Sequence, residues 1–178
     1  MARTVRLFAV CGSLRRASAN RAALEALGLL ADQGVAVEIW SGLAALPAFN
    51  PDDEEPGAAL PPAVAELRRK AETCDGLIVA APEYAHGVPG GLKNALDWLV
   101  GSEAFAGKPT MLVNVAPRAF HAQAQLREIL TTMAARIVPE ACVIIPLGSR
   151  HAGAEAIAGD GSLATKLREG LSGLLAAI

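Results

Sequence analysis

Aromatic residues, cysteines and long apolar runs are all scarce in this chain of 178 residues. Aromatic side chains make up 4% of it, and Tyr84 is the single tyrosine. No stretch approaches the roughly 20 consecutive apolar residues that a membrane-spanning helix needs. The three cysteines form no CxxC pair, which argues against a zinc site or a disulfide framework. The first apolar run is too short for a signal peptide. We therefore expect a cytoplasmic protein with no membrane partner.

Strong net charge is also missing, because 16 basic and 18 acidic residues leave a formal charge of −2. A chain so close to neutral lacks the basic surface that binds nucleic acid, so we expect no such partner. The histidines His86, His121 and His151 show no metal-ligand spacing, and no metal site is predicted. Hydrophobic residues make up 52% of the chain, which is ample for the core of one domain spanning residues 1–178.

Short apolar runs alternate with amphipathic helical patterns along the chain. Most runs are apolar on both faces, as in parallel strands covered by helices on each side. The predicted strands are Val5–Cys11, Val35–Trp40, Gly76–Ala81, Thr110–Val115 and Cys142–Pro146. The predicted helices are Asn20–Gln33, Pro62–Thr73, Gly91–Val100, His121–Ile137 and Leu163–Ile178. Strand and helix alternate five times, which predicts an α/β three-layer sandwich with a five-stranded parallel sheet. The acidic loop Ser41–Pro61 is predicted to be a solvated surface excursion.

Ligands of open parallel sheets bind beyond the carboxyl ends of the strands, where the strand order reverses. Three loops follow predicted strands at that edge: "GSLRRASAN" (Gly12–Asn20), "PEYAHGVPGG" (Pro82–Gly91) and "APRAFHAQ" (Ala116–Gln123). We expect the three loops to converge on one site.

The first of these loops has the composition of a phosphate site. Ser13, Ser18 and Asn20 offer short hydrogen-bond donors, Arg15 and Arg16 offer positive charge, and a helix N-terminus follows. The loop is neither a Walker loop nor a GxGxxG dinucleotide motif, which argues against a nucleoside triphosphate. The alternative is that Ser18 only caps the helix and the arginines only add solubility.

The second loop combines stiffness, backbone access and one aromatic ring. Pro82 and Pro89 restrict it, glycines such as Gly87 let backbone N–H groups approach a flat ligand, and Tyr84 supplies a π face. A phosphate cradle beside such a loop indicates a mononucleotide with a planar ring. The alternative is a tight connector with a half-buried tyrosine.

The motifs "GSLRRASAN" and "PEYAHGVPGGLKNALDWLV" together resemble the NADPH-dependent FMN reductase family, which includes chromate, quinone and azo-dye reductases. The resemblance extends from about Val5 to the C-terminus. It implies a flavodoxin-like fold with strand order 2-1-3-4-5, noncovalent FMN, NADPH or NADH as the electron donor, and a homodimer or homotetramer. Placed by position, the phosphate contacts would be Ser13, Arg15, Ser18 and Asn20. The residues framing the flavin would be Pro82, Glu83, Tyr84 and Gly87.

Two departures from the family pattern stand out. The family usually has asparagine after the tyrosine, where this chain has Ala85, so one ring contact is expected to be missing. The third loop is usually rich in glycine and serine, but here it carries Pro117, Arg118, Phe120 and His121. Of these, Pro117, Arg118 and Phe120 are candidates for contacts with nicotinamide. The alternative is that Arg118 points to solvent and Phe120 packs under its own helix.

The leading hypothesis is an oxidoreductase that passes electrons from NAD(P)H through FMN to a quinone-like or other small acceptor. Such an enzyme needs no catalytic side chain of its own, because hydride is transferred to the N5 atom of the flavin. One alternative is a flavin-binding electron carrier without a nicotinamide site. Another is a structural or regulatory protein that has lost the flavin through the two departures.

Overall fold

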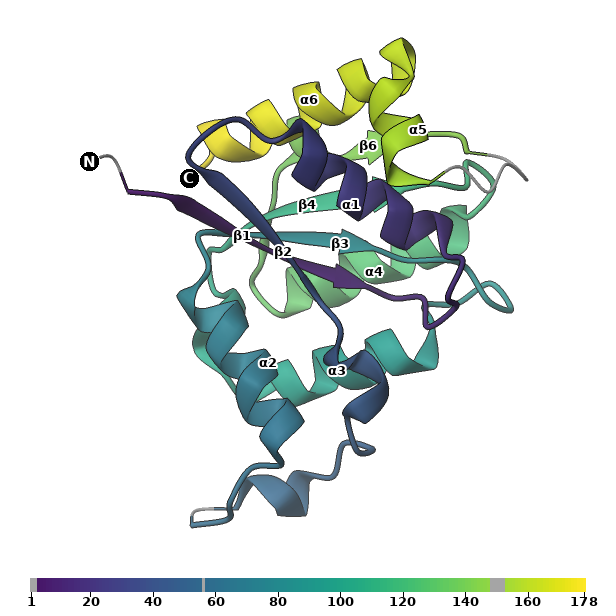
Figure 1. The fold of residues 1–178 in the computed structure, drawn as a ribbon. Helices are drawn as coiled ribbons and strands as arrows, with labels where there is room; N and C mark the ends of the chain where they lie inside the picture. Colours follow the sequence, from purple (N-terminus) through teal and green to yellow (C-terminus); the bar gives the residue numbers. More distant parts are fainter. Residues whose placement is uncertain (1–2, 56, 148–152) are drawn as a thin grey trace.

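Strands and helices alternate along the chain as the apolar pattern predicts, and the computed structural model describes residues 3–55, 57–147 and 153–178 (Figure 1). The strands are β1 (Val5–Cys11), β2 (Val35–Trp40), β3 (Gly76–Ala80), β4 (Pro109–Asn114), β5 (Arg136–Ile137) and β6 (Val143–Ile144). The helices are α1 (Ala19–Leu30), α2 (Pro62–Thr73), α3 (Gly90–Val100), α4 (Phe120–Thr132), α5 (Ala154–Gly159) and α6 (Gly161–Ala176). None of the described helices is both long and apolar enough to cross a membrane.

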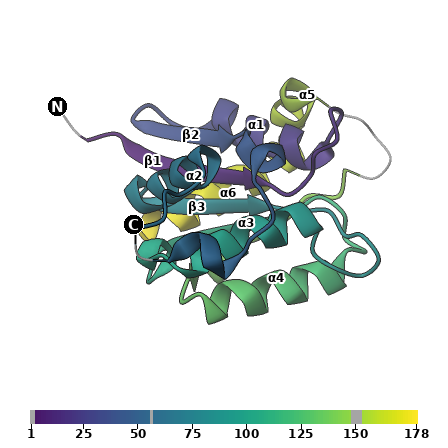
Figure 2. The same cartoon turned by 90° about the horizontal axis from the view of Figure 1, so that it is seen from below.

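The strands form one parallel sheet in the order β2-β1-β3-β4-β5, which confirms the order that the family resemblance implied. Helices cover both faces: α1, α5 and α6 lie on one side, and α2, α3 and α4 lie on the other (Figures 1 and 2). Each face has its own apolar core. Every residue of β3 is buried, which explains why this strand is apolar on both of its faces.

The fifth position of the sheet differs from the prediction. In place of one strand over Cys142–Pro146, two strands of two residues each pair with β4: β5 near its start and β6 near its end. Between them lies a 3₁₀ helix that begins at Pro139. Proline has no N–H to donate to a sheet, so the strand is interrupted there.

Helix α4 also ends earlier than predicted, at Thr132 rather than Ile137. The backbone of Ala134 is left-handed, with φ of 59°, and the N–H of Ala135 donates to the carbonyl of Leu130 over 2.9 Å. This pattern closes a helix and usually places glycine where Ala134 stands. The sequence therefore contained no visible stop signal. Helix α1 likewise stops at Leu30 instead of Gln33, and α5 was not predicted.

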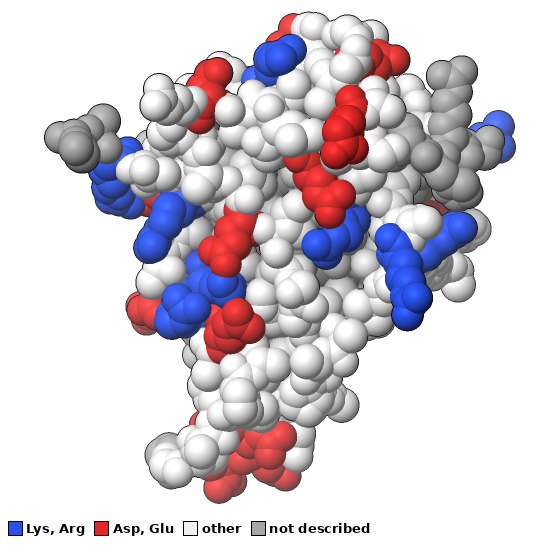
Figure 3. All heavy atoms as spheres, in the orientation of Figure 1, with Lys and Arg blue, Asp and Glu red and all other residues white. Residues whose placement is uncertain are grey.

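The loop 41–61 is held against the protein at its base, so its prediction as a solvated excursion was wrong for that part. The carbonyl of Pro47 accepts hydrogen bonds from Asn94 Nδ2 and Trp98 Nε1, over 2.8 and 2.9 Å. Asn94 Oδ1 accepts the N–H of Phe49, whose ring meets Trp98 edge-on with centroids 5.1 Å apart. The acidic tip of the loop, seen as the red group at the bottom of Figure 3, reaches into solvent.

Candidate functional site

The three candidate loops begin side by side, because β1, β3 and β4 are neighbours in the sheet and all end at the edge on the right of Figure 1. The N–H of Gly12, the first residue after β1, donates to the carbonyl of Ala80 at the end of β3 over 2.8 Å. A Cβ atom at Gly12 would lie 2.9 Å from Leu92 Cδ2 and 3.2 Å from Ala81 Cβ. A side chain here would crowd α3 and the residue that follows β3, which favours glycine at this position.

Two serines of the first loop accept backbone N–H groups with their hydroxyl oxygens, and Ser18 Oγ also lies 3.9 Å from Cys11 Sγ. Ser18 caps α1 by accepting the N–H of Arg21 over 3.3 Å, as the alternative interpretation predicted. Ser13 Oγ accepts the N–H of Arg15 over 3.3 Å. In both bonds the hydroxyl hydrogen is left available to a ligand. Capping and phosphate binding by Ser18 are therefore compatible.

The side chain of Asn20 is the clearest sign that this loop binds a ligand. Its side chain is buried, yet its Oδ1 atom has no hydrogen-bond partner. A buried amide is almost always paired, since an unmade hydrogen bond costs about 1–3 kcal/mol. Turning the amide about its terminal bond exchanges its oxygen and nitrogen, so the same position can offer N–H donors. The donors and the helix N-terminus of this loop fit a phosphate group.

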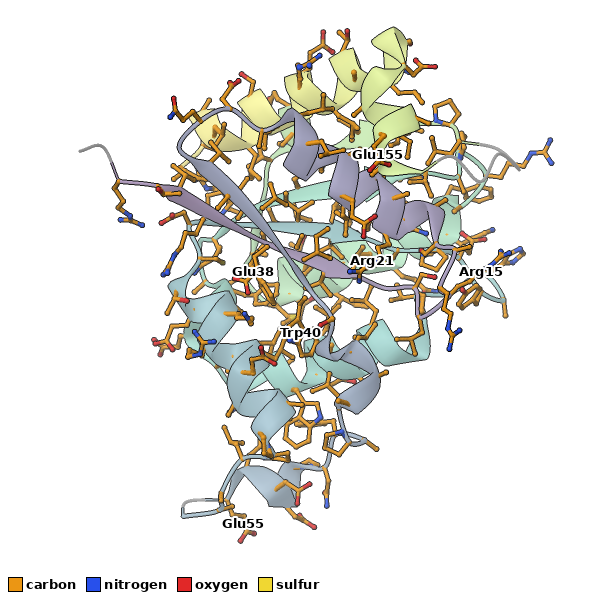
Figure 4. The ribbon with its side chains drawn as sticks, viewed as in Figure 1. Arg15, Arg21, Glu38, Trp40, Glu55 and Glu155 are labelled. Carbon is orange, nitrogen blue, oxygen red and sulfur yellow. The ribbon has the colours of Figure 1, made fainter. Side chains whose placement is uncertain are left out.

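Arginines surround the loop and supply positive charge (Figure 4). A pocket of about 360 Å³ opens between the loop and the end of β2, and its lining includes Ser13, Arg15, Arg21 and Trp40. Arg15 is exposed and projects outward from the loop, whereas Arg21 lies on α1. Arg21 is paired with Glu25 over 2.9 Å, so Arg15 is the freer of the two to meet an anion.

The second loop contains a two-residue turn that the sequence did not reveal. Tyr84 and Gly87 exchange backbone hydrogen bonds of 3.1 and 2.9 Å, and the residues between them, Ala85 and His86, have φ of 49° and 60°. Left-handed backbone at both central positions defines a type I′ turn, which favours asparagine and glycine. The left-handed backbone of this loop is therefore at Ala85 and His86 and not at Gly87. Tyr84 is 57% exposed, so its ring is accessible to a ligand.

Glu83 and Gln125 join the second loop to α4. Glu83 Oε2 accepts the N–H of Ala122 in the first turn of α4 over 2.9 Å, a favourable place for a carboxylate. Gln125 accepts the N–H of Val88 through Oε1, over 3.2 Å, and donates through Nε2 to the carbonyl of His86, over 3.3 Å. Glu83 therefore holds the loop in position. Gln125 was missed because nothing in its sequence neighbourhood points to a partner 37 residues away.

The third loop exposes its unusual residues instead of burying them. Pro117, Arg118 and Phe120 are all exposed, and Phe120 at 63% does not pack under its own helix as one interpretation held. The centroid of its ring lies 4.1 Å from that of His121, and the ring of His121 stacks on that of His86 with centroids 4.3 Å apart. A row of three rings thus connects the third loop with the second.

The remaining titratable and thiol groups of the described residues do not form a metal site. Among the described residues no three His, Cys, Asp or Glu side chains are placed to hold a metal ion, and His151 lies outside those residues. All the cysteines are free thiols, and burial raises the pKa of Cys74 above its ordinary value. Lys93 pairs with Asp97 on the surface of α3, as their spacing predicts.

The fold and the placement of the ligand loops define a flavodoxin-like protein. The solved structure of FerB, a flavoenzyme NAD(P)H:(acceptor) oxidoreductase from Paracoccus denitrificans, matches with a TM-score of 0.74 at 22% identity, covering 97% of each chain. Flavodoxin 1 from Bacillus cereus matches with a TM-score of 0.61 at 16% identity, covering 97% of this chain and 99% of that one. At these identities the likeness shows the fold alone.

Sequence comparison is more specific. Residues 5–149 match the family described as NADPH-dependent FMN reductase. An NAD(P)H-dependent FMN reductase from Pseudomonas aeruginosa is 35% identical over 136 residues, which are 73% of this chain and 71% of the relative. A quinone reductase from Escherichia coli is 31% identical over 144 residues, covering 78% and 76%. The chain belongs to the NADPH-dependent FMN reductase family, which confirms the resemblance found in its motifs. It is therefore an oxidoreductase that uses FMN and NAD(P)H.

Proposed function

We propose that this enzyme transfers electrons from NAD(P)H to a quinone, with FMN held by the first two loops. The observation that carries the assignment of the site is the unpaired, buried amide of Asn20 under a loop of short donors. Relatives named quinone reductase in Escherichia coli and Pseudomonas putida support the acceptor class. When bound, FMN accepts hydride and passes on electrons, so the protein has only to hold and orient the reactants.

One group of residues contacts the phosphate of FMN in this proposal, and another group surrounds its ring. In our proposal Ser13, Ser18 and Asn20 donate hydrogen bonds to the phosphate, and Arg15 balances its charge. Pro82, Tyr84 and Gly87 frame the ring, while Glu83 positions this frame by capping α4. The exposed third loop, with Pro117, Arg118 and Phe120, borders the face that nicotinamide and acceptor would approach.

The assignment predicts that Arg15→Ala weakens FMN binding by about 1.5–3 kcal/mol, the range for a hydrogen bond to a charged group. Fluorescence titration with FMN measures this loss, and riboflavin, which lacks the phosphate, should bind the variant and the wild type equally. Arg69→Ala is the matched control, because Arg69 is an exposed arginine on α2. Unchanged FMN affinity in Arg15→Ala would remove Arg15 from the site and make Arg16 the next candidate.

The electron-transfer proposal is tested by the visible spectrum of the purified protein and its response to NADPH without oxygen. We expect flavin bands that bleach on addition of NADPH and return when a naphthoquinone is added. Bands that persist with NADPH would instead indicate an electron carrier without a nicotinamide site. Bleached bands that a quinone does not restore would exclude quinones and leave the other acceptors.

We further propose that the chain is a single domain that forms a cytoplasmic homodimer or homotetramer through α3 and α4. Val100 at the end of α3 is 64% exposed, and a large apolar side chain in that position gains from being covered by a second subunit. Light scattering at micromolar concentration measures the mass directly. A monomeric mass would contradict the proposal.

A further inference from the structure

A second pocket, of about 420 Å³, lies between α4 and the edge of the sheet formed by β4 and β6. It is separate from the phosphate loop, since no residue of the first or second loop lines it. Its volume falls within the range of small-molecule sites, and most of its lining is apolar, as in such sites. The lining residues used below are Leu112, Phe120, Ile144, Asn114, Gln123 and Arg127.

One wall of this pocket contains a buried donor without a partner. Gln123 Nε2 is buried and makes no hydrogen bond to the protein. Asn114 Oδ1, another polar group of the lining, accepts the N–H of Ala116 over 2.9 Å and no hydrogen bond from Gln123. A small rotation of the Gln123 side chain toward the pocket would give its N–H group a ligand acceptor. The unpaired donor favours a ligand with a strong hydrogen-bond acceptor.

The charged residues of the lining indicate that the acceptor group of the ligand is negatively charged. Arg127 is exposed beside Gln123 on the same helix face, and the ion pairs found in the described part of the chain do not include it. None of the residues that line the pocket is acidic. A guanidinium fork and an amide N–H together suit a carboxylate, which accepts both in one plane.

The apolar residues of the lining indicate that the rest of the ligand is an apolar, flat group. Phe120 and Ile144 are 63% and 56% exposed, although the chain contains only seven aromatic residues with which to build its core. An exposed phenyl ring offers a stacking surface, and the buried Leu112 provides an apolar floor. A phosphate would gain little here, because one arginine and one amide leave most of its oxygens without donors.

We propose that this pocket binds a small, flat carboxylate, with its ring on Phe120 and Ile144 and its carboxyl group on Arg127 and Gln123. Nothing in this assignment requires FMN, because the pocket does not overlap the first two loops. It does share Pro117 and Phe120 with the third loop, which borders the proposed approach of nicotinamide. The ligand would nevertheless touch the row of rings that runs through His121 to His86 in the second loop.

The experiment is a calorimetric titration of the full-length protein with 2-naphthoate, in the presence and absence of saturating FMN. We expect millimolar or tighter binding, unchanged by FMN, that weakens about tenfold or more in Arg127→Gln, since a hydrogen bond to a charged group is lost. Gln123→Leu should weaken it several-fold. The neutral analogue 2-naphthalenemethanol should bind wild type and Arg127→Gln alike.

Arg168→Gln is the matched control, because Arg168 is an exposed arginine on α6, across the sheet from α4. It should leave naphthoate binding intact, and thermal unfolding of each variant verifies that it is folded. Three results would overturn the proposal: no heat of binding at millimolar naphthoate, equal affinity in wild type and Arg127→Gln, or displacement of naphthoate by FMN. The last result would place the ligand in the cofactor site.

Discussion

The turn at Ala85 and His86 holds two non-glycine residues in left-handed backbone, and replacing Ala85 by asparagine should stabilise the protein. Left-handed backbone costs a residue with a Cβ about 1–2 kcal/mol, and asparagine tolerates it better because its side chain bonds locally. Alanine and asparagine differ little in the freedom of the unfolded chain, unlike alanine and glycine. We therefore expect Ala85→Asn to raise the free energy of unfolding by about 0.5–1 kcal/mol.

For a chain of this length such a gain raises the melting temperature by about 1–4 °C. The measurement is thermal and denaturant unfolding of the FMN-free protein, so that any new contact with the cofactor is kept apart from the effect on the fold. Ala59→Asn is the control, because Ala59 is also exposed in a loop but its φ is not positive. Equal effects of the two substitutions, or a lower melting temperature for Ala85→Asn, would refute the reasoning.

The third loop and one partly buried lysine give the remaining predictions. If the exposed ring of Phe120 restricts access to the flavin, Phe120→Gly speeds flavin reduction by NADPH in stopped flow, with FMN affinity nearly unchanged; identical rates exclude a gate. If Arg118 contacts the extra phosphate of NADPH, Arg118→Ala raises the KM for NADPH more than that for NADH, and an equal rise counts against it. Lys108 Nζ donates to three backbone carbonyls at the end of α2 over 2.8–2.9 Å. Lys108→Met should therefore lower the free energy of unfolding by about 2–3 kcal/mol, against no measurable change for the exposed Lys166→Met.

The apolar pattern predicted the centre of the sheet well because buried parallel strands must be apolar on both faces. It located β1, β3 and β4 to within one residue at each end. It failed where backbone geometry rather than burial decides the structure. Ala134 ends α4 in a conformation that normally calls for glycine, and Pro139 divides the last strand. Neither event changes the hydrophobic pattern.

The same limit applies to the candidate site. Spacing and residue type identified which loops meet, because the ends of neighbouring parallel strands lie at one edge of the sheet. They did not identify which side chains tie the loops together. Glu83 was expected to help frame the flavin, but its hydrogen bond to the first turn of α4 was not foreseen, and Gln125 was not considered at all. Such contacts depend on the relative placement of two loops, which only the folded chain supplies.

The interruption at Pro139 also affects how the protein meets other copies of itself. An uninterrupted outer strand presents a row of free N–H and C=O groups on which another chain can form a strand, and this begins aggregation. Here the outer edge offers only two-residue pieces on either side of a 3₁₀ helix. At the opposite edge, β2 carries the exposed Glu38, whose carboxylate pairs with Lys70 of α2. The charged side chain on β2 and the interrupted strand at the opposite edge therefore both hinder another chain from adding a strand to the sheet.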